Sequence, residues 1–236
     1  MDAIGFLVGP SDFLPSNAST AFGADSVRAW FAGGGARAQF DRGAAVWSPG
    51  GMLRRAAPVL AARGVAMWAY LSQGNTFPGD GGFCAAKTLP LAERHRCHAA
   101  SGFPLPDPDG SWEWWATLIS EGVGLIRELA PPVRHFHLWN EPNAGAWRDH
   151  LDNGTEYSDF FSAVSARIHK DNPGVAVGGP VTFCPMTGYY DPKSGAEEGA
   201  TTWAAFGKQL IDAALPSGQL DFFDSVNTTA SASFLA

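Results

Sequence analysis

Residues 133–142 read VRHFHLWNEP, and the interpretation of the whole chain starts from this stretch. Its first seven residues, Val133–Trp139, are predicted to form a short strand, because Pro131-Pro132 ends the helical pattern before them. Pro142 lacks an amide hydrogen and disfavours helical angles at Glu141, so the strand ladder stops there. We therefore expect Glu141, with Asn140 beside it, at the C-terminal end of a buried strand.

On both sides of this stretch, short β-rich runs alternate with longer helical patterns, which is typical of βα units on a parallel sheet. Strands are predicted at Ala3–Val8, Ser26–Ala32, Val65–Leu71, Val133–Trp139, Val175–Gly179 and Leu220–Val226. Helices are predicted at Met52–Arg63, Trp112–Leu129, Tyr157–Lys170 and Thr202–Leu215. The pattern amounts to about six βα units in one domain that spans residues 1–236.

Two long segments interrupt the alternation. Ser72–Gly110 is rich in Gly and Pro, and Thr182–Thr201 follows the fifth predicted strand. Long loops without periodicity are often functional. Because both follow strands, a barrel would place them on its C-terminal face, where active sites are built. They are candidate walls of a substrate cleft.

The composition excludes several classes of partner. The chain has 17% charged residues and a net charge of −7, so nucleic acids and anionic membrane surfaces are not expected to attract it. It contains no run of 18 apolar residues that would predict a membrane span. Neutral sugars remain open as ligands. The nine Trp residues are equally suited to sugar stacking and to core packing.

The N-terminus and the cysteines bear on the compartment and on metal binding. Residues 1–8 lack the basic and long apolar regions of a signal peptide, so the protein is either cytoplasmic or secreted by a leader outside this chain. Cys84, Cys97 and Cys184 do not follow a metal-ligand spacing, and neither a metal nor an organic cofactor is expected. Cys84 and Cys97 either pair in an oxidising compartment or remain free thiols.

The segment from His137 to Asn143, HLWNEPN, resembles the acid/base motif of clan A glycoside hydrolases. Residues 174–180, GVAVGGP, and Leu220–Val226 are more specifically similar to glycoside hydrolase family 39, the β-xylosidase and α-L-iduronidase type. The resemblance implies a (β/α)₈ TIM barrel and a retaining reaction on β-linked sugars. It also implies that Glu141 is the general acid/base and that Asn140 binds the 2-hydroxyl of the sugar. Read without its context, Glu141 would equally suit a surface loop carboxylate.

Other candidate residues have competing interpretations. Arg28, on the second predicted strand, resembles a clan arginine that supports the nucleophile, but a salt bridge at the edge of the core explains it as well. His137 and His135 lie on the same strand as the motif and either line a substrate cleft or fill a barrel interior. A contact with substrate is also predicted for Trp139. Three further aromatic residues are candidates for a sugar-stacking platform, for which core packing is the alternative: Trp68, Tyr70 and Trp147.

The chain departs from the family in two ways. The family places its nucleophile, a Glu, at the end of strand seven, and no segment after Val226 is suited to be that strand. At the exit of strand six the family has a His and a Tyr, where this chain has Asn227-Thr228-Thr229. We therefore expect a barrel truncated before strand seven, with negligible hydrolysis by this chain alone. The rival hypothesis is a non-catalytic carbohydrate-binding or degenerate glycosidase-like protein.

Overall fold

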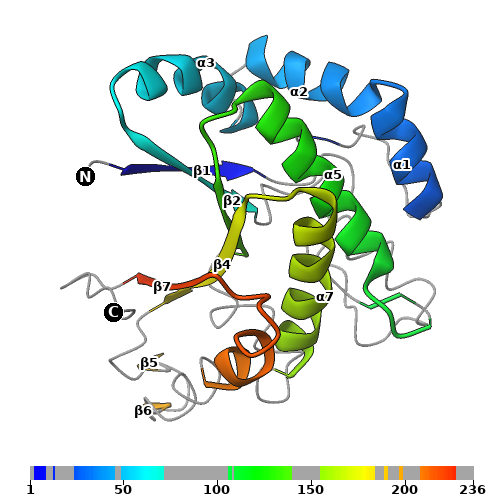
Figure 1. Cartoon of the computed structure of the whole chain (residues 1–236), viewed down its shortest axis with the longest axis vertical. Helices are drawn as coiled ribbons and strands as arrows, with labels where there is room; N and C mark the ends of the chain where they lie inside the picture. Colours follow the sequence, from blue (N-terminus) through cyan, green and yellow to red (C-terminus); the bar gives the residue numbers. More distant parts are fainter. Residues whose placement is uncertain are drawn as a thin grey trace.

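Five parallel strands form the sheet that organises the protein, as seen in a computed structural model (Figure 1). The structure describes residues 3–8, 13, 24–45, 49–71, 106–107, 109–139, 155–183, 189–190, 197–198 and 208–226. The strands are ordered β1-β2-β3-β4-β7, so β1 and β7 are the outer strands of the sheet. Their bounds are Ala3–Val8 for β1, Ala66–Leu71 for β2, His135–Leu138 for β3, Ala176–Phe183 for β4 and Phe222–Val226 for β7.

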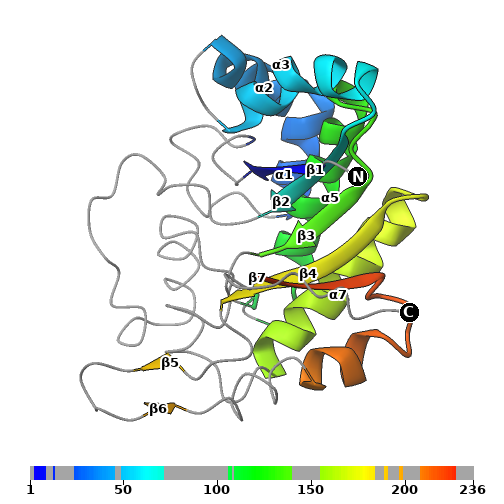
Figure 2. The ribbon, with the colours of Figure 1, turned by 90° about the vertical axis from the view of Figure 1, so that its left-hand side faces the viewer.

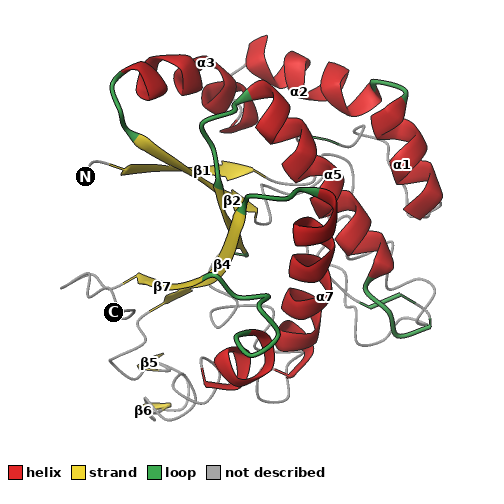
Figure 3. Cartoon of the chain, in the orientation of Figure 1, coloured by secondary structure: helices red, strands yellow, loops and turns green. Residues whose placement is uncertain are grey.

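The described helices cover one face of this sheet (Figures 1 and 3). They are α1 (Ala24–Ala32), α2 (Gly35–Ala45), α3 (Pro49–Ala62), α5 (Glu113–Leu129) and α7 (Thr155–Asp171), with a further helix at 208–214. Figure 2 views the sheet from the side away from α5 and α7, which lie behind the strands. Sequential parallel strands joined through helices are the βα arrangement that the alternating sequence pattern predicted. The α/β class is thus confirmed, and closure into a (β/α)₈ barrel stays a prediction.

The core lies between the helices and the sheet. Val123 and Ile126 of α5 are fully buried, as are Phe160 and Val164 of α7. From the sheet, Phe136 of β3 faces the same layer and is also fully buried. Side chains of this size each contribute about 1.5–3 kcal/mol when they are removed from water. The packing of α5 and α7 on β3 therefore holds the strand that precedes the Asn140-Glu141 motif.

Most predicted elements are confirmed with small shifts in their bounds. Predicted helices at 52–63, 112–129 and 157–170 correspond to α3, α5 and α7. The predicted helix at 202–215 is described from 208 to 214. Predicted strands at 3–8, 65–71, 133–139, 175–179 and 220–226 correspond to the five strands of the sheet. Gly64, two residues after the end of α3, has φ 68°, a left-handed conformation that glycine adopts at low cost.

The predicted strand at Ser26–Ala32 is wrong, because this segment lies inside helix α1. Val27 is fully buried, and Trp30 and Phe31 pack against the same core. Spacings of three and four residues place these side chains on one face of a helix, which outweighs the short alternation that suggested a strand. The described sheet therefore has five strands where six were expected. Consequently β3, which leads to Glu141, is the third strand of the sheet and not the fourth.

Gly178 on β4 allows Phe222 of β7 to lie close over the strand. A Cβ atom added at Gly178 would come within 2.2 Å of the Phe222 carbonyl oxygen and 2.5 Å of its ring. Gly178 pairs in register with His137 on one side and with Phe222 on the other. The missing side chain thus lets the Phe222 ring reach His137, at a centroid distance of 4.8 Å.

We expect Gly178→Ala to lower the free energy of unfolding by about 1–3 kcal/mol, because the added methyl group overpacks a strand that cannot move freely. Urea unfolding followed by tryptophan fluorescence measures this change. Adding Phe222→Ala should restore only part of the loss, because the Phe222 carbonyl group remains in place. An unchanged urea midpoint in Gly178→Ala would contradict this account of the strand pair.

Candidate functional site

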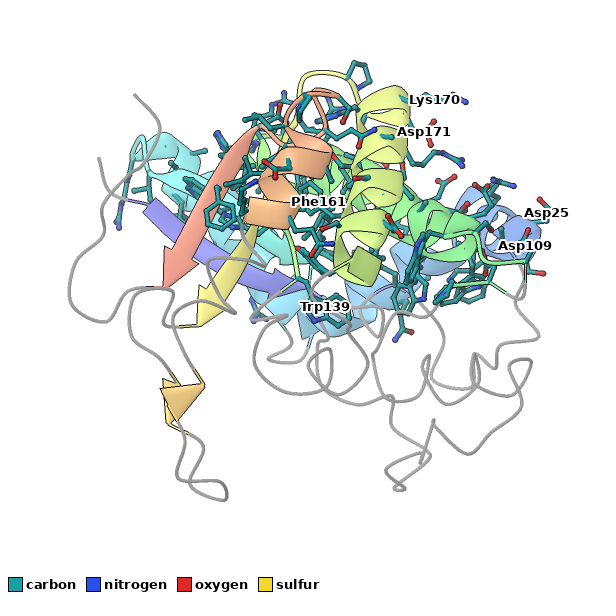
Figure 4. The ribbon with its side chains drawn as sticks, turned by 90° about the horizontal axis from the view of Figure 1, so that it is seen from below. Asp25, Asp109, Trp139, Phe161, Lys170 and Asp171 are labelled. Carbon is teal, nitrogen blue, oxygen red and sulfur yellow. The ribbon has the colours of Figure 1, made fainter. Side chains whose placement is uncertain are left out.

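The candidate site lies at the edge of the sheet where the parallel strands end. Figure 4 shows β4 and β7 pointing towards the side of the molecule on which Trp139 lies. The chain leaves β3 at Leu138 on this edge, and Trp139 is the last described residue before Asn140 and Glu141. Asn140, Glu141 and Trp147 lie outside the described residues. Their predicted roles as substrate-binding and catalytic groups stay predictions.

Trp139 makes an unusual turn at the end of β3. Its φ is 74°, the one positive value among the described residues that are not glycine. Such a backbone conformation costs a bulky residue about 1–3 kcal/mol, which the surrounding structure must offset. The Trp139 amide donates a hydrogen bond to the Leu71 carbonyl oxygen at 2.9 Å, which ties the turn to the end of β2.

The Trp139 side chain packs into the helix layer. The residue is 2% exposed, and its ring lies edge-on to Trp115 of α5 at 6.4 Å and to Phe160 of α7 at 6.1 Å, measured between ring centroids. Trp139 therefore belongs to the buried core, and its predicted contact with substrate stays a prediction.

His137 belongs to a group of rings on the sheet face away from the helices, here called the inner-face cluster: Trp68, His135, His137 and Phe222. Trp68 lies 4.8 Å from both histidine rings and 5.3 Å from Phe222, between centroids. His137 is completely buried within the described structure. The structure thus brings three rings that the sequence singled out together with Phe222, which it did not. Tyr70 pairs with His137 in register, but its side chain is not among those described.

Burial governs the charge of His137. The pKa of its imidazole falls from 6.5 to about 3, because burial penalises the charged form and because His135 lies nearby. His137 is therefore neutral near pH 7. A neutral imidazole among aromatic rings is suited to shape the inner face of the sheet, and it does not carry a proton ready for transfer at that pH.

Arg28 lies on helix α1 and not on a strand, which corrects its predicted position. Its guanidinium pairs with Asp25 at 2.8 Å and with Glu113 of α5, and it donates to Thr117 Oγ1 at 3.2 Å. These partners are on helices of the outer layer. The structure therefore places Arg28 in an ion pair at the edge of the core, the alternative that the sequence left open.

Glu113 is the centre of this outer charge group. It also accepts from Arg167 of α7, at 3.1 Å, and from the Thr117 hydroxyl at 3.2 Å. Burial raises the pKa of Glu113, but the hydrogen bonds from Thr117 and Arg167 and the charge of Arg167 outweigh burial and leave it below its ordinary value. The group therefore links α1, α5 and α7 as a structural contact between helices.

We expect Arg28→Met to cost at most about 1 kcal/mol of stability, because its ion pairs are partly exposed. Its affinity for an oligosaccharide should equal that of the unchanged chain, because Arg28 lies in the outer helix layer. Lys208→Met, which removes another surface ion pair, with Asp212, serves as the matched control. Calorimetric titration of both variants measures the affinity. A loss of oligosaccharide affinity in Arg28→Met but not in Lys208→Met would support a role for Arg28 in substrate binding.

Two of the carboxylates that the structure describes after Glu141, Asp221 and Asp171, are engaged in other contacts. Asp221 accepts a hydrogen bond from the Val177 amide at 2.7 Å and lies 2.9 Å from His169 Nε2. Val177 is near the start of β4, so Asp221 is at the opposite edge of the sheet from Trp139. Asp171 accepts from Ser120 at 3.1 Å and pairs with Arg167 in the helix layer. These groups are therefore unsuited to face Glu141 across a glycosidic bond.

Tyr157 is a feature that sequence reasoning did not assign to the site. It lies in the first turn of α7, is fully buried, and donates a hydrogen bond from its hydroxyl to the Leu138 carbonyl oxygen at 2.5 Å. Burial raises the pKa of Tyr157 well above its usual range, so the hydroxyl keeps its proton. The sequence signal was weak, because one Tyr at the start of a predicted helix is ordinary core material.

Within the described part of the chain, no group of three or more His, Cys, Asp or Glu side chains is arranged to hold a metal ion. None of the helices described is long and apolar enough to cross a membrane.

Comparison with known proteins returned no matching family model and no matching curated protein. Similar solved structures include glycoside hydrolases. Wild-type BuGH86 in complex with neoagarooctaose is 17% identical, with a TM-score of 0.46 over 86% of this chain. A substituted form of BuGH86 with the same ligand gives 17% and 0.47 over 86%. A family 39 glycoside hydrolase from Bacteroides cellulosilyticus WH2 gives 16% and 0.35 over 94%. The chain spans 28% of the length of both BuGH86 chains and 37% of the family 39 enzyme.

Proposed function

We propose that this chain carries the acid/base half of a retaining glycoside hydrolase that cleaves O-glycosidic bonds of β-linked sugars, with Glu141 as the general acid/base. One observation carries the proposal. The HLWNEPN motif begins with the last two residues of β3, a strand of the parallel sheet, and Asn140 and Glu141 follow in sequence directly after Trp139 at the C-terminal end of that strand. That edge is where α/β folds of this kind bind their ligands.

The chemistry needs two carboxyl groups, one on each side of the scissile bond. Glu141 gives its proton to the departing glycosidic oxygen while a carboxylate nucleophile attacks the anomeric carbon. Glu141, now ionised, then takes a proton from the water that displaces the carboxylate and frees the sugar. Asn140 is suited to hydrogen-bond the hydroxyl next to the anomeric carbon. A β-xylosidase type of substrate is our first choice, while glucosidase, iduronidase and endoglycanase activity fit the same motif.

The second carboxyl group is the part of the site that this chain lacks in our proposal. Asp221 and Asp171 are held elsewhere in the structure, as described above. Without a neighbouring carboxylate, Glu141 loses the like-charge repulsion that raises the pKa of a catalytic acid.

Calorimetric titration with xylohexaose and cellohexaose tests the proposal. The chain should bind one of them, and Asn140→Ala should weaken that binding about tenfold or more, as expected when a hydrogen bond to a sugar hydroxyl is lost. Arg28→Met provides a control on the far side of the helix layer. Failure to bind either sugar would count against the proposal.

A non-catalytic carbohydrate-binding protein is the second candidate, and the placement of Asp221 and Asp171 away from the motif favours it. Both candidates predict oligosaccharide binding. They differ in what happens when a strand bearing a terminal Glu is supplied from a longer polypeptide that contains this chain. Hydrolysis by that polypeptide supports the hydrolase, and binding without hydrolysis supports the binding protein.

A further inference from the structure

The backbone turn at Trp139 sets the direction in which the chain leaves β3. Two peptide units separate Trp139 from Glu141, so covalent geometry keeps their Cα atoms within about 7 Å of each other. If Trp139 relaxed to an ordinary strand conformation, its φ would move from 74° to about −120° and redirect everything after it. The left-handed turn at Trp139 therefore sets the direction of the backbone that leads to Asn140 and Glu141.

Three contacts hold this turn in place. The Trp139 amide donates to the Leu71 carbonyl oxygen at 2.9 Å, and the Tyr157 hydroxyl donates to the Leu138 carbonyl oxygen at 2.5 Å. The Trp139 ring is enclosed edge-on by Trp115 and Phe160. The peptide between Leu138 and Trp139 is thus fixed on its carbonyl side by α7 and on its amide side by β2.

Tyr157 is well built for this contact. Its ring is fully buried and lies 6.1 Å from both Phe160 and Phe161, between centroids, so the hydroxyl is delivered from a rigid position. Burial also raises its pKa, which keeps the hydroxyl a donor at alkaline pH. Tyr157 lies on α7 after the motif in sequence, yet it bonds the residue just before the turn.

We propose that Tyr157 and Trp139 are positioning residues that lock the backbone where the chain leaves β3 and thereby fix the start of the segment that carries Asn140 and Glu141. Neither side chain touches substrate in this role. The consequence for sugar binding rests on the proposed function, whereas the locking of the turn does not. Because catalytic geometry is sensitive to displacements of about 1 Å, a lock of this kind matters for the groups that follow it.

Tyr157→Phe tests the lock, because it removes one hydroxyl group and keeps the ring. Ser165→Ala is the matched control, since Ser165 is also buried on α7 and also donates from its hydroxyl to a backbone carbonyl, that of Gln219. Amide hydrogen exchange by NMR reports the Trp139 amide directly. The amide of Ile126 in the core of α5 reports global stability in the same sample.

We expect Tyr157→Phe to speed exchange at Trp139 about tenfold or more relative to Ile126, and Ser165→Ala to leave that ratio unchanged. Binding of xylohexaose or cellohexaose should weaken about tenfold in Tyr157→Phe and not in Ser165→Ala. An unchanged exchange ratio in Tyr157→Phe overturns the lock. Faster exchange with unchanged sugar affinity overturns its positioning role. Absence of binding by the unchanged chain is a failure of the proposed function, visible before any variant is made.

Discussion

The purified chain is expected to bind β-linked oligosaccharides and to leave an aryl β-xyloside uncleaved during prolonged incubation. A retaining site depends on two carboxyl groups about 5–5.5 Å apart. Asp221 and Asp171, which follow Glu141 in the sequence, are engaged in other contacts, with the Val177 amide and with Arg167. Loss of a catalytic nucleophile can lower turnover on the order of 10⁶-fold. Release of the aryl alcohol, followed by absorbance over days, measures the residual rate.

Glu141→Gln is the control for this experiment, because it keeps the shape of the side chain and removes its proton. We expect the same background rate with and without the substitution. Turnover by the unchanged chain that disappears in Glu141→Gln would contradict the prediction that this chain does not supply a nucleophile. It would still support the role of Glu141. Turnover that survives the substitution would contradict both parts of the account.

Acidification is expected to destabilise the protein through His137. Its pKa is 6.5 in the unfolded chain and about 3 in the folded one, so the unfolded state binds the proton first. Above pH 6.5 the imidazole is neutral in both states, and the free energy of unfolding does not depend on it. As the pH falls from 6.5 towards 3, the proton binds the unfolded state first, and the free energy of unfolding decreases progressively. Linkage gives a loss of about 2 kcal/mol between pH 7.5 and pH 5.

His137→Phe should remove this pH dependence, because a phenyl ring fits the aromatic surroundings of Trp68 and Phe222 and does not titrate. Urea unfolding of both proteins at pH 7.5 and pH 5 measures the effect, and the difference between the two proteins cancels the contributions of other titrating groups. About 2 kcal/mol of the acid-induced loss should be absent from His137→Phe. Equal losses in both proteins would show that His137 is not the buried neutral group described here.

The sequence predicted those elements whose own side chains specify them. Helices α5 and α7 have apolar residues at spacings of three and four, and β2 is a short apolar run between turn signals. The strand predicted at 26–32 was wrong because two patterns overlap there. Val27, Ala29 and Phe31 alternate as in a strand, while Val27, Trp30 and Phe31 also match the spacing of a helix. Packing of α1 on α5 decided between these patterns, and packing is a tertiary effect that local periodicity does not contain.

The candidate site shows the same limit. The motif and its place after a strand were readable from the sequence, because proline chemistry and strand length are local properties. The burial of the Trp139 ring was not, because a positive φ at a tryptophan depends on partners from β2, α5 and α7. Nor could the partners of Arg28 be read, since Glu113 lies 85 residues away in the sequence.

A crystal structure of the Glu141→Gln variant with a bound xylohexaose or cellohexaose examines the central claim most directly. We predict that the side-chain amide introduced at position 141 will lie about 2.6–3.2 Å from a glycosidic oxygen, at the edge of the sheet where β3 ends. The sugar chain bound elsewhere, or the side chain at position 141 directed into bulk solvent away from it, would contradict the assignment of Glu141 as the proton donor.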